Sequence, residues 1–206
     1  MGEISDIINS KPIEKLTGFF SEIVGKPLVD AAGVLYGDAI KAKRISNGLK
    51  LEEMYNLRKS DDIIPTSLSF GYKLLEKATL EDNDELLNKW ANLLSNATDK
   101  KFSGSIRKIF VEILESLEPV DVKLFDEINK YCLTTTNKYQ TMVSLKNIDF
   151  SKKETLDVLL SLGLITFGVT SSTGVSISGN YPSTFHGLNK FNVTEMGQSF
   201  YKAVNR

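Results

Sequence analysis

Cysteine and histidine are almost absent from this chain of 206 residues, which contains one of each, Cys132 and His186. An internal disulfide needs two cysteines, and the usual structural zinc sites need four cysteine or histidine ligands. The sequence therefore excludes an internal disulfide and argues against a metal centre of this kind. We expect no metal and no cofactor.

The chain also lacks an excess of charge of either sign. It has 25 lysines and arginines against 26 aspartates and glutamates, and its formal net charge is −1. No global field therefore draws the protein onto nucleic acid or an acidic membrane, and any such binding must be local.

Long hydrophobic runs are missing as well. The most apolar stretch, from Pro27 to about Ser46, contains Asp30 and Asp38 and falls short of the roughly 18 apolar residues that a membrane span needs. Its Gly33 and Gly37 have the spacing at which small residues let two helices approach closely. We interpret this as close helix packing rather than membrane insertion.

The first ten residues, Met1–Ser10, are polar and acidic. A secretory signal would have a basic region followed by an apolar one. Together with the single cysteine, this favours a reducing compartment, and we expect a cytoplasmic protein.

Apolar residues at helical spacing are present along most of the chain. The clearest pattern, after the acidic turn Glu81–Asp84, places Leu86, Trp90, Leu93 and Ala97 on one face of a helix. We predict a mainly α-helical protein whose region 1–117 is a helical bundle. Its other helices are expected from Ser10 to Gly25, Pro27 to about Ser46, about Ser67 to Ala78, and Ser105 to Leu117.

Three asparagines, Asn88, Asn92 and Asn96, lie four residues apart on another stripe of the clearest helix. Their amides could bind a peptide, a base or a partner helix through hydrogen bonds. We favour the simpler interpretation, in which they face solvent or a neighbouring helix, and keep them as candidate partner-binding residues.

Region 118–206 has a different order of elements. A helix that closes on Leu162-Gly163-Leu164-Ile165 and runs into a strand is typical of winged-helix modules, with Gly163 supplying a left-handed C-cap. We predict a winged-helix-like module with a small β-hairpin wing. Its elements are expected as a helix from Pro119 to Tyr131, an apolar segment from Met142 to Ile148, a helix from Lys152 to Leu162, strands Ile165–Thr170 and Phe191–Val193, and a last helix from Thr194.

DNA binding by this module has weak support from its charges. The candidate recognition helix offers Lys152 and Lys153 for phosphates, but also carries Glu154 and Asp157. From residue 133 to the end, seven basic residues stand against four acidic ones, a small excess. We therefore favour a protein partner over sequence-specific DNA.

The expected wing holds three side chains that could form a contact surface, Tyr181, Phe185 and His186. A Gly/Ser-rich loop with a few aromatic residues is also often only a hairpin tip. We keep these three, with Lys152 and Lys153, as candidate partner-binding residues.

Motifs of catalysis are not found in the sequence. There is no phosphate-binding Gly-rich loop ending in Lys-Ser/Thr and no His-Glu-x-x-His, and a single histidine removes most triad chemistry. The acidic pairs Glu52-Glu53 and Asp61-Asp62 and the acids of Glu81–Glu85 are typical of helix starts and solvated turns. We predict that the protein is not an enzyme.

Several local patterns resemble the signature of the abortive-infection alpha family. They are Ile64-Pro65, Leu74–Ala78, Glu81-Asp82, Glu85–Leu87, Trp90–Leu94 with Asp99, Leu117–Asp121 and Leu162–Ile165, which together extend the similarity over most of Lys26 to Val204. The departure is the long wing from Val169 to Lys190, which puts a shared wing-tip partner in doubt.

This resemblance implies a role in bacterial defence against phage, in which an infected cell stops growing or dies before progeny are released. The family has no accepted catalytic residues to carry over. Our first hypothesis is a binding or sensor protein that engages a phage or host component and that could also form homo-oligomers. The alternative is a winged-helix DNA-binding transcriptional regulator that uses Lys152, Lys153 and the wing.

Overall fold

The computed structural model describes residues 11–25, 38–134, 143–144, 153–167 and 190–205. The chain divides into two compact units, Met1–Ser116 with Lys202–Arg206, and Leu117–Tyr201. The prediction of a mainly helical protein is confirmed, and a small antiparallel sheet accompanies the helices.

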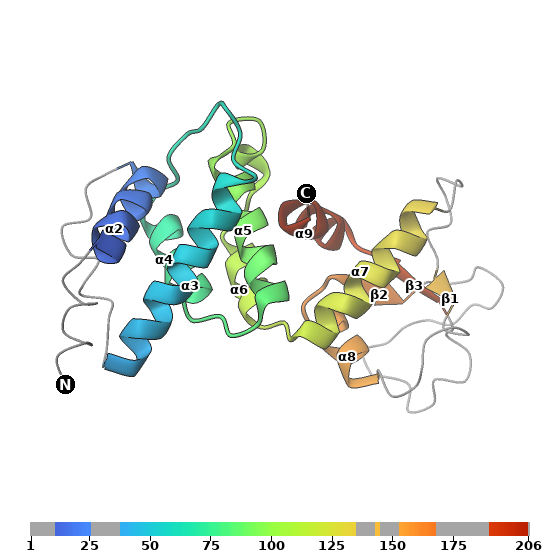
Figure 1. The fold of residues 1–206 in the computed structure, drawn as a ribbon. Helices are drawn as coiled ribbons and strands as arrows, with labels where there is room; N and C mark the ends of the chain where they lie inside the picture. Colours follow the sequence, from blue (N-terminus) through green and yellow to red (C-terminus); the bar gives the residue numbers. More distant parts are fainter. Residues whose placement is uncertain (1–10, 26–37, 135–142, 145–152, 168–189, 206) are drawn as a thin grey trace. The chain divides into compact units, whose positions relative to one another are not determined.

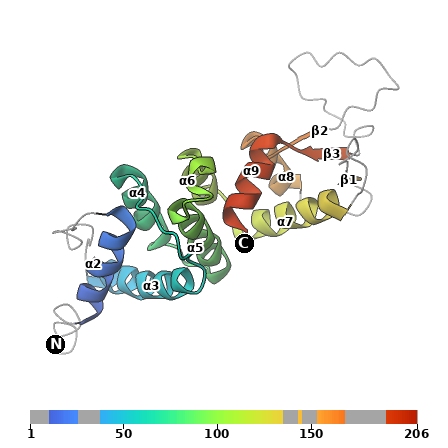
Figure 2. The same ribbon diagram turned by 90° about the horizontal axis from the view of Figure 1, so that it is seen from above.

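The first unit is helical throughout its described part (Figure 1). Its central helix, α5, packs against α3, α4 and α6, and Figure 2 shows α6 on the side of α5 away from α3. The elements are α2 (Lys11–Val24), α3 (Asp38–Asn56), α4 (Leu68–Ala78), α5 (Asp84–Thr98), the 3₁₀ turn η2 (Ser103–Ser105) and α6 (Ile109–Glu115).

Helix α5 confirms the strongest helix prediction. Asn83 is its N-cap, and its side-chain oxygen accepts hydrogen bonds from the backbone N–H groups of Glu85 (2.9 Å) and Leu86 (3.1 Å). The predicted apolar face is buried, with Trp90 1% exposed and Leu93 fully buried. This face supplies the centre of the first unit's core.

Helix α3 continues to Asn56, so the predicted end near Ser46 is wrong. Gly48 permits close packing against α2, because a Cβ at this position would lie 3.0 Å from Leu16 Cδ2. The turns that follow contribute Leu51 and Tyr55, both fully buried. Burial in the core therefore extends the helix beyond the predicted end.

Helix α6 begins at Ile109, so the predicted start at Ser105 is also wrong. The Ser105 hydroxyl donates to the carbonyl of Phe102 over 2.7 Å, a local bond of the kind that competes with α-helix formation. Ile106 then adopts an extended backbone, with φ −82° and ψ 123°. The result is a short 3₁₀ turn in place of the first helical turn.

The second unit combines three helices with a three-stranded antiparallel sheet in the order β1-β3-β2. Val143 is paired with Phe191, and Phe167 is also paired with Phe191, so β3 is the central strand. Phe125 and Phe200 pack against each other with ring centroids 6.0 Å apart. The elements are α7 (Pro119–Thr134), β1 (Val143–Ser144), α8 (Lys153–Ser161), β2 (Ile165–Phe167), β3 (Lys190–Val193) and α9 (Glu195–Val204).

The turn from α8 into β2 is built on Gly163. Its φ of 68° confirms the predicted left-handed C-cap, and the N–H of Leu164 reaches back to the carbonyl of Leu159 at 3.0 Å, as in a Schellman motif. Thr194 joins this turn to the start of α9, since its hydroxyl donates to the carbonyl of Gly163 (2.6 Å) and accepts from the N–H of Gly197 (2.9 Å).

Within the ranges given above, no helix combines the length and the apolar character that crossing a membrane requires.

Candidate functional site

Four of the predicted partner-binding residues, Lys152, Tyr181, Phe185 and His186, lie outside the described residues. Lys153 is the first residue of α8, but its side chain is also outside the description. Their role in binding stays a prediction.

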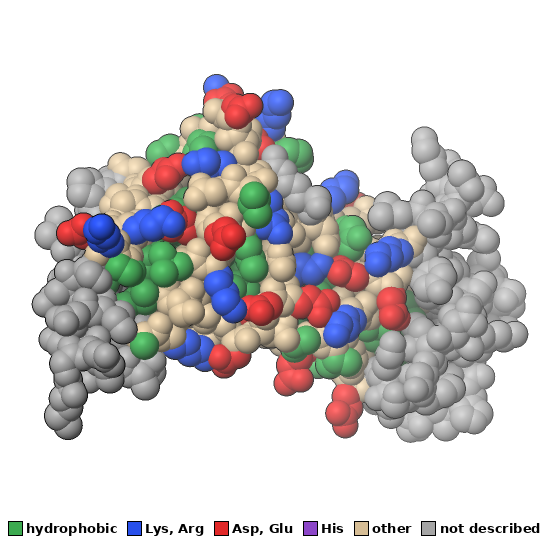
Figure 3. Space-filling view, in the orientation of Figure 1, with side chains coloured by type: hydrophobic (Ala, Val, Ile, Leu, Met, Phe, Trp, Pro, Cys, Tyr) green, Lys and Arg blue, Asp and Glu red, His purple; other side chains and the backbone are tan. Residues whose placement is uncertain are grey.

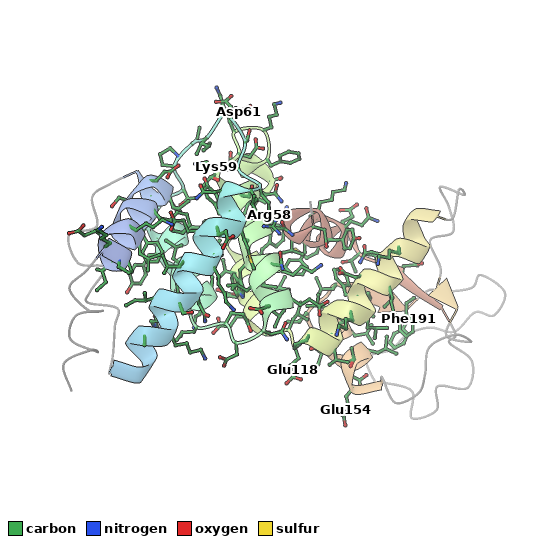
Figure 4. The ribbon with its side chains drawn as sticks, viewed as in Figure 1. Arg58, Lys59, Asp61, Glu118, Glu154 and Phe191 are labelled. Atoms are coloured by element: carbon green, nitrogen blue, oxygen red, sulfur yellow. The ribbon has the colours of Figure 1, made fainter. Side chains whose placement is uncertain are left out.

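The described face of α8 is acidic. Glu154 and Asp157 are exposed, whereas Leu156 and Leu159 are buried in the second unit. Figure 4 shows Glu154 projecting away from the helix. Carboxylates in this position repel phosphate groups.

The asparagine stripe of α5 lies against the end of the chain, within the first unit. The amide of Asn92 donates to the carbonyl of Val204 over 3.0 Å. The amide of Asn96 donates to the carbonyls of Ala203 (2.8 Å) and Lys202 (3.4 Å), and this side chain is only 4% exposed. The helix-facing interpretation of these two asparagines therefore agrees with the structure.

These contacts satisfy the end of α9. The last four carbonyls of a helix have no partner within the helix. In α9, three of them, those of Lys202, Ala203 and Val204, accept hydrogen bonds from the amides of Asn92 and Asn96. Lys89, which is 7% exposed, adds a bond from its ammonium to the side-chain oxygen of Asn205 (2.5 Å). A cation near a helix C-terminus is favourable because of the helix dipole.

Asn88 has different partners. Its side-chain oxygen accepts from the Arg58 guanidinium over 2.5 Å, and the same guanidinium donates to the carbonyl of Met54 over 2.6 Å. Figure 4 shows Arg58 where the chain leaves α3 beside α5. This stripe of α5 is therefore used for internal contacts at each of its three asparagines.

The acidic groups singled out in the sequence do not come together. Glu52 pairs with Lys15 (3.2 Å), Asp62 with Lys100 (3.4 Å) and Asp84 with Lys50 (2.8 Å). Among the residues that the structure describes, no three Asp, Glu, His or Cys side chains are grouped so that they could hold a metal ion. Each named carboxylate has a structural partner.

Tyr55 is a buried titratable group in the core of the first unit. Burial raises the pKa of its hydroxyl above the ordinary value, partly offset by a hydrogen bond with the Thr98 hydroxyl at 3.1 Å. Either hydroxyl can donate in this pair, and the Thr98 hydroxyl also lies 3.1 Å from the carbonyl of Leu94. The contact joins α3 to α5.

A concentration of positive charge follows α5, and the sequence motifs did not predict it. Lys100, Lys101, Arg107 and Lys108 occur with no acidic residue between Asp99 and Glu112. We call residues Lys100–Lys108 the basic loop. A count of charges over this segment reveals the positive excess, whereas the net charge of the whole chain, which is close to zero, does not.

Figure 3 shows acidic and basic side chains interspersed over the face that it presents, with apolar side chains scattered among them. Many of these charges are paired, such as Lys73 with Glu112 (2.7 Å) and Lys77 with Glu115 (2.6 Å). Within the basic loop itself every charged side chain is a cation, although Lys100 pairs with the neighbouring Asp62 (3.4 Å).

A hollow of about 220 Å³ lies beside the basic loop, within the first unit. Its lining includes both polar and apolar side chains, among them Thr66, Ser67, Phe70, Ser103, Ile106 and Lys108. Hydroxyls, one cation and one aromatic ring in a single hollow can receive a polar ligand that has a flat apolar part.

Comparison with known proteins finds one family. A family model described as "Abortive infection alpha" matches residues 39–204. No curated protein and no solved structure matches the chain.

Proposed function

Because the chain belongs to the abortive infection alpha family, we propose that it defends a bacterium against phage by binding a phage or host component in the cytoplasm, without catalysis. The observation that carries this proposal is the extent of the family match, residues 39–204, which includes most of both compact units.

The non-catalytic part of the proposal is supported by what the candidate groups do. The carboxylates of Glu52 and Asp84 are held by lysines, and that of Asp121 accepts from the backbone N–H of Glu118 over 2.9 Å at the start of α7. Groups used in this way stabilise helices and their packing.

For the second unit we propose a winged-helix-like recognition module with a protein partner. The order of its elements, α7, β1, α8, β2, β3 and α9, supports the fold, and the exposed Glu154 and Asp157 on α8 support a protein over DNA. The same fold serves many functions, so the partner must be identified by experiment.

The test is expression in a phage-sensitive host followed by challenge with a broad panel of phages. We expect reduced plating of at least one phage. We also expect the culture to survive when phages are few and to collapse when every cell is infected, because abortive infection sacrifices the infected cell.

The matched control is a Gly197→Ala variant, which should fold poorly and lose protection. Unchanged plating across the panel, with the wild-type protein present and folded, would overturn the proposal. Survival of the culture when every cell is infected would also overturn it, since the infected cells would then not be sacrificed.

A further inference from the structure

We propose that the basic loop binds single-stranded nucleic acid, with its cations holding phosphates and with Phe102 and the adjacent hollow receiving bases. The inference deepens the proposed function by naming a ligand class for the first unit, and its role in defence rests on that function. The binding itself stands on the structure of the loop.

The loop's positive charge is open to solvent. Lys101, Arg107 and Lys108 are exposed, and Lys100 pairs with Asp62 at 3.4 Å. Asp99 is 2% exposed and accepts from the backbone N–H of Lys101 over 2.9 Å, while Glu112 pairs with Lys73. The four cations of the loop outnumber Asp62 and Asp99 beside them, so the loop keeps a local excess of positive charge although the chain as a whole is slightly negative.

The loop is held in shape before any ligand arrives. The carbonyl of Asp99 accepts from the N–H groups of Phe102 (3.0 Å) and Ser103 (2.8 Å), and Lys100 N–H donates to the carbonyl of Asp62 over 3.2 Å. Ser105 closes the next turn through Phe102. Ordering costs on binding are therefore small for this backbone.

The cations lie at both ends of the loop. Lys100 and Lys101 begin it, and Arg107 and Lys108 end it. A nucleic-acid strand carries a phosphate roughly every 3.4 Å along its axis in a duplex, and less densely when extended. Cations at two places on one loop can therefore hold more than one phosphate of a strand.

An aromatic ring stands among these cations. Phe102 is 49% exposed, a high value for a large apolar side chain next to three lysines and an arginine. A Cβ added at Gly104 would have no heavy atom within 4 Å, so the space beside the loop is open. Exposed aromatic rings in positive surroundings stack bases with little sequence preference.

The size of the hollow decides between a strand and a free nucleotide. Pockets that enclose a small molecule usually measure about 300 to 1,000 Å³ and bury most of the ligand. This hollow, at about 220 Å³, is smaller and lies open beside the loop. It suits one nucleotide of a longer strand, whose neighbouring phosphates are held by Arg107 and Lys108.

The experiment is fluorescence anisotropy of the full-length protein with labelled oligouridylate, oligothymidylate and a DNA duplex of the same length, between about 50 and 200 mM salt. We expect both single strands to bind more tightly than the duplex, and the ratio between them shows whether the source is RNA or DNA. The variant Arg107→Gln/Lys108→Gln loses two phosphate contacts, and each lowers the slope of log affinity against log salt by about 0.7. It should therefore bind about 25-fold more weakly than the wild type near 0.1 M salt, if the two have equal affinity near 1 M. Phe102→Ala should weaken binding by about fivefold or more.

The matched control is Lys43→Gln/Lys50→Gln, which removes the same charge from lysines paired with Asp82 and Asp84. It should change the affinity by less than about twofold, because these two lysines lie on α3 and not on the basic loop, and exposed charges away from the ligand are screened by salt. Circular dichroism of each variant establishes that it is folded.

Four results would each overturn the inference. They are no binding of any strand by the folded protein at low salt, equal losses in the loop and control variants, preference for the duplex with no effect of Phe102→Ala, and loss only in Lys152→Gln/Lys153→Gln. Binding to phosphatidylserine vesicles in place of oligonucleotides would assign the loop to membranes instead.

The phage challenge separates this inference from the proposed function. A protein that protects but binds no strand keeps the function and loses the inference. A protein that binds strands through Arg107 and Lys108 but does not protect keeps the inference and loses the function.

Discussion

The side-chain amide of Asn96 donates to the main-chain carbonyl of Ala203 over 2.8 Å, and so joins the middle of the chain to its end within one compact unit. Asn96 is 4% exposed and Ala203 is 3% exposed. A hydrogen bond in such surroundings satisfies a carbonyl that neither its own helix nor water can reach.

Asn96→Ala should therefore destabilise the protein by about 1 to 3 kcal/mol, the usual cost of leaving a buried group without its partner. Urea denaturation, followed through the fluorescence of the buried Trp90, measures this loss. The control is Asn56→Ala at the exposed end of α3, which should stay within about 0.5 kcal/mol of the wild type. Equal losses of unfolding free energy in the two variants would show that the hydrogen bond to Ala203 does not stabilise the protein.

Asn96→Asp tests the same contact by charge. A carboxylate at this position would face the carbonyls of Lys202 and Ala203 at the negative end of α9, so its pKa should be raised and the variant should be less stable than Asn96→Ala at neutral pH. A raised folded-state pKa means that stability is regained as the pH falls, because the protonated carboxyl can again donate. A denaturation series from neutral to mildly acidic pH, with Asn96→Ala as the reference, should show the two variants converging.

Gly197 is required by the close approach of α9 to the start of β2. An added Cβ would overlap the carbonyl oxygen of Leu164 and lie 2.9 Å from Val193 Cγ1. Gly197→Ala should therefore cost at least about 1 to 3 kcal/mol, measured by thermal denaturation. Gly18→Ala in α2, where an added Cβ meets nothing within 4 Å, should instead stabilise the protein by about 0.5 to 1 kcal/mol. Destabilisation of the same size at both positions would contradict this account.

The sequence predicts well those features that depend on neighbouring residues. The apolar face of α5 and the left-handed conformation of Gly163 follow from periodicity and from local backbone chemistry, and both are confirmed. The end of α3 was predicted wrongly because Leu51 and Tyr55, beyond Ser46, are buried in the core. The start of α6 was predicted wrongly because Ser105 forms a local hydrogen bond with Phe102 in place of the first helical turn.

The contacts of the candidate site were harder to predict, because they join residues that are far apart in the sequence. The sequence marks Asn96 as a polar residue on an exposed-looking stripe, but its partner is 107 residues away and no spacing rule reveals it. The basic loop was readable from Lys100, Lys101, Arg107 and Lys108 in the sequence, yet its exposure and the hollow beside it depend on the folded first unit. The predicted residues Tyr181, Phe185 and His186 remain untested, since they lie outside the described residues.

The Tyr55 hydroxyl predicts a loss of stability in alkaline solution. Burial raises its pKa in the folded state, so above the ordinary value of about 10 the unfolded chain releases a proton that the folded chain retains. The contribution to stability is complete below about pH 10 and is lost as the pH rises through the folded-state pKa. Tyr55→Phe removes this dependence together with the hydrogen bond to Thr98, which costs about 1 kcal/mol at neutral pH. Urea denaturation at a series of pH values should therefore show the free energy of unfolding of the wild type approaching that of Tyr55→Phe above about pH 10. The control Asn56→Ala should keep the pH dependence of the wild type. Parallel pH curves for the wild type and Tyr55→Phe would refute the assignment.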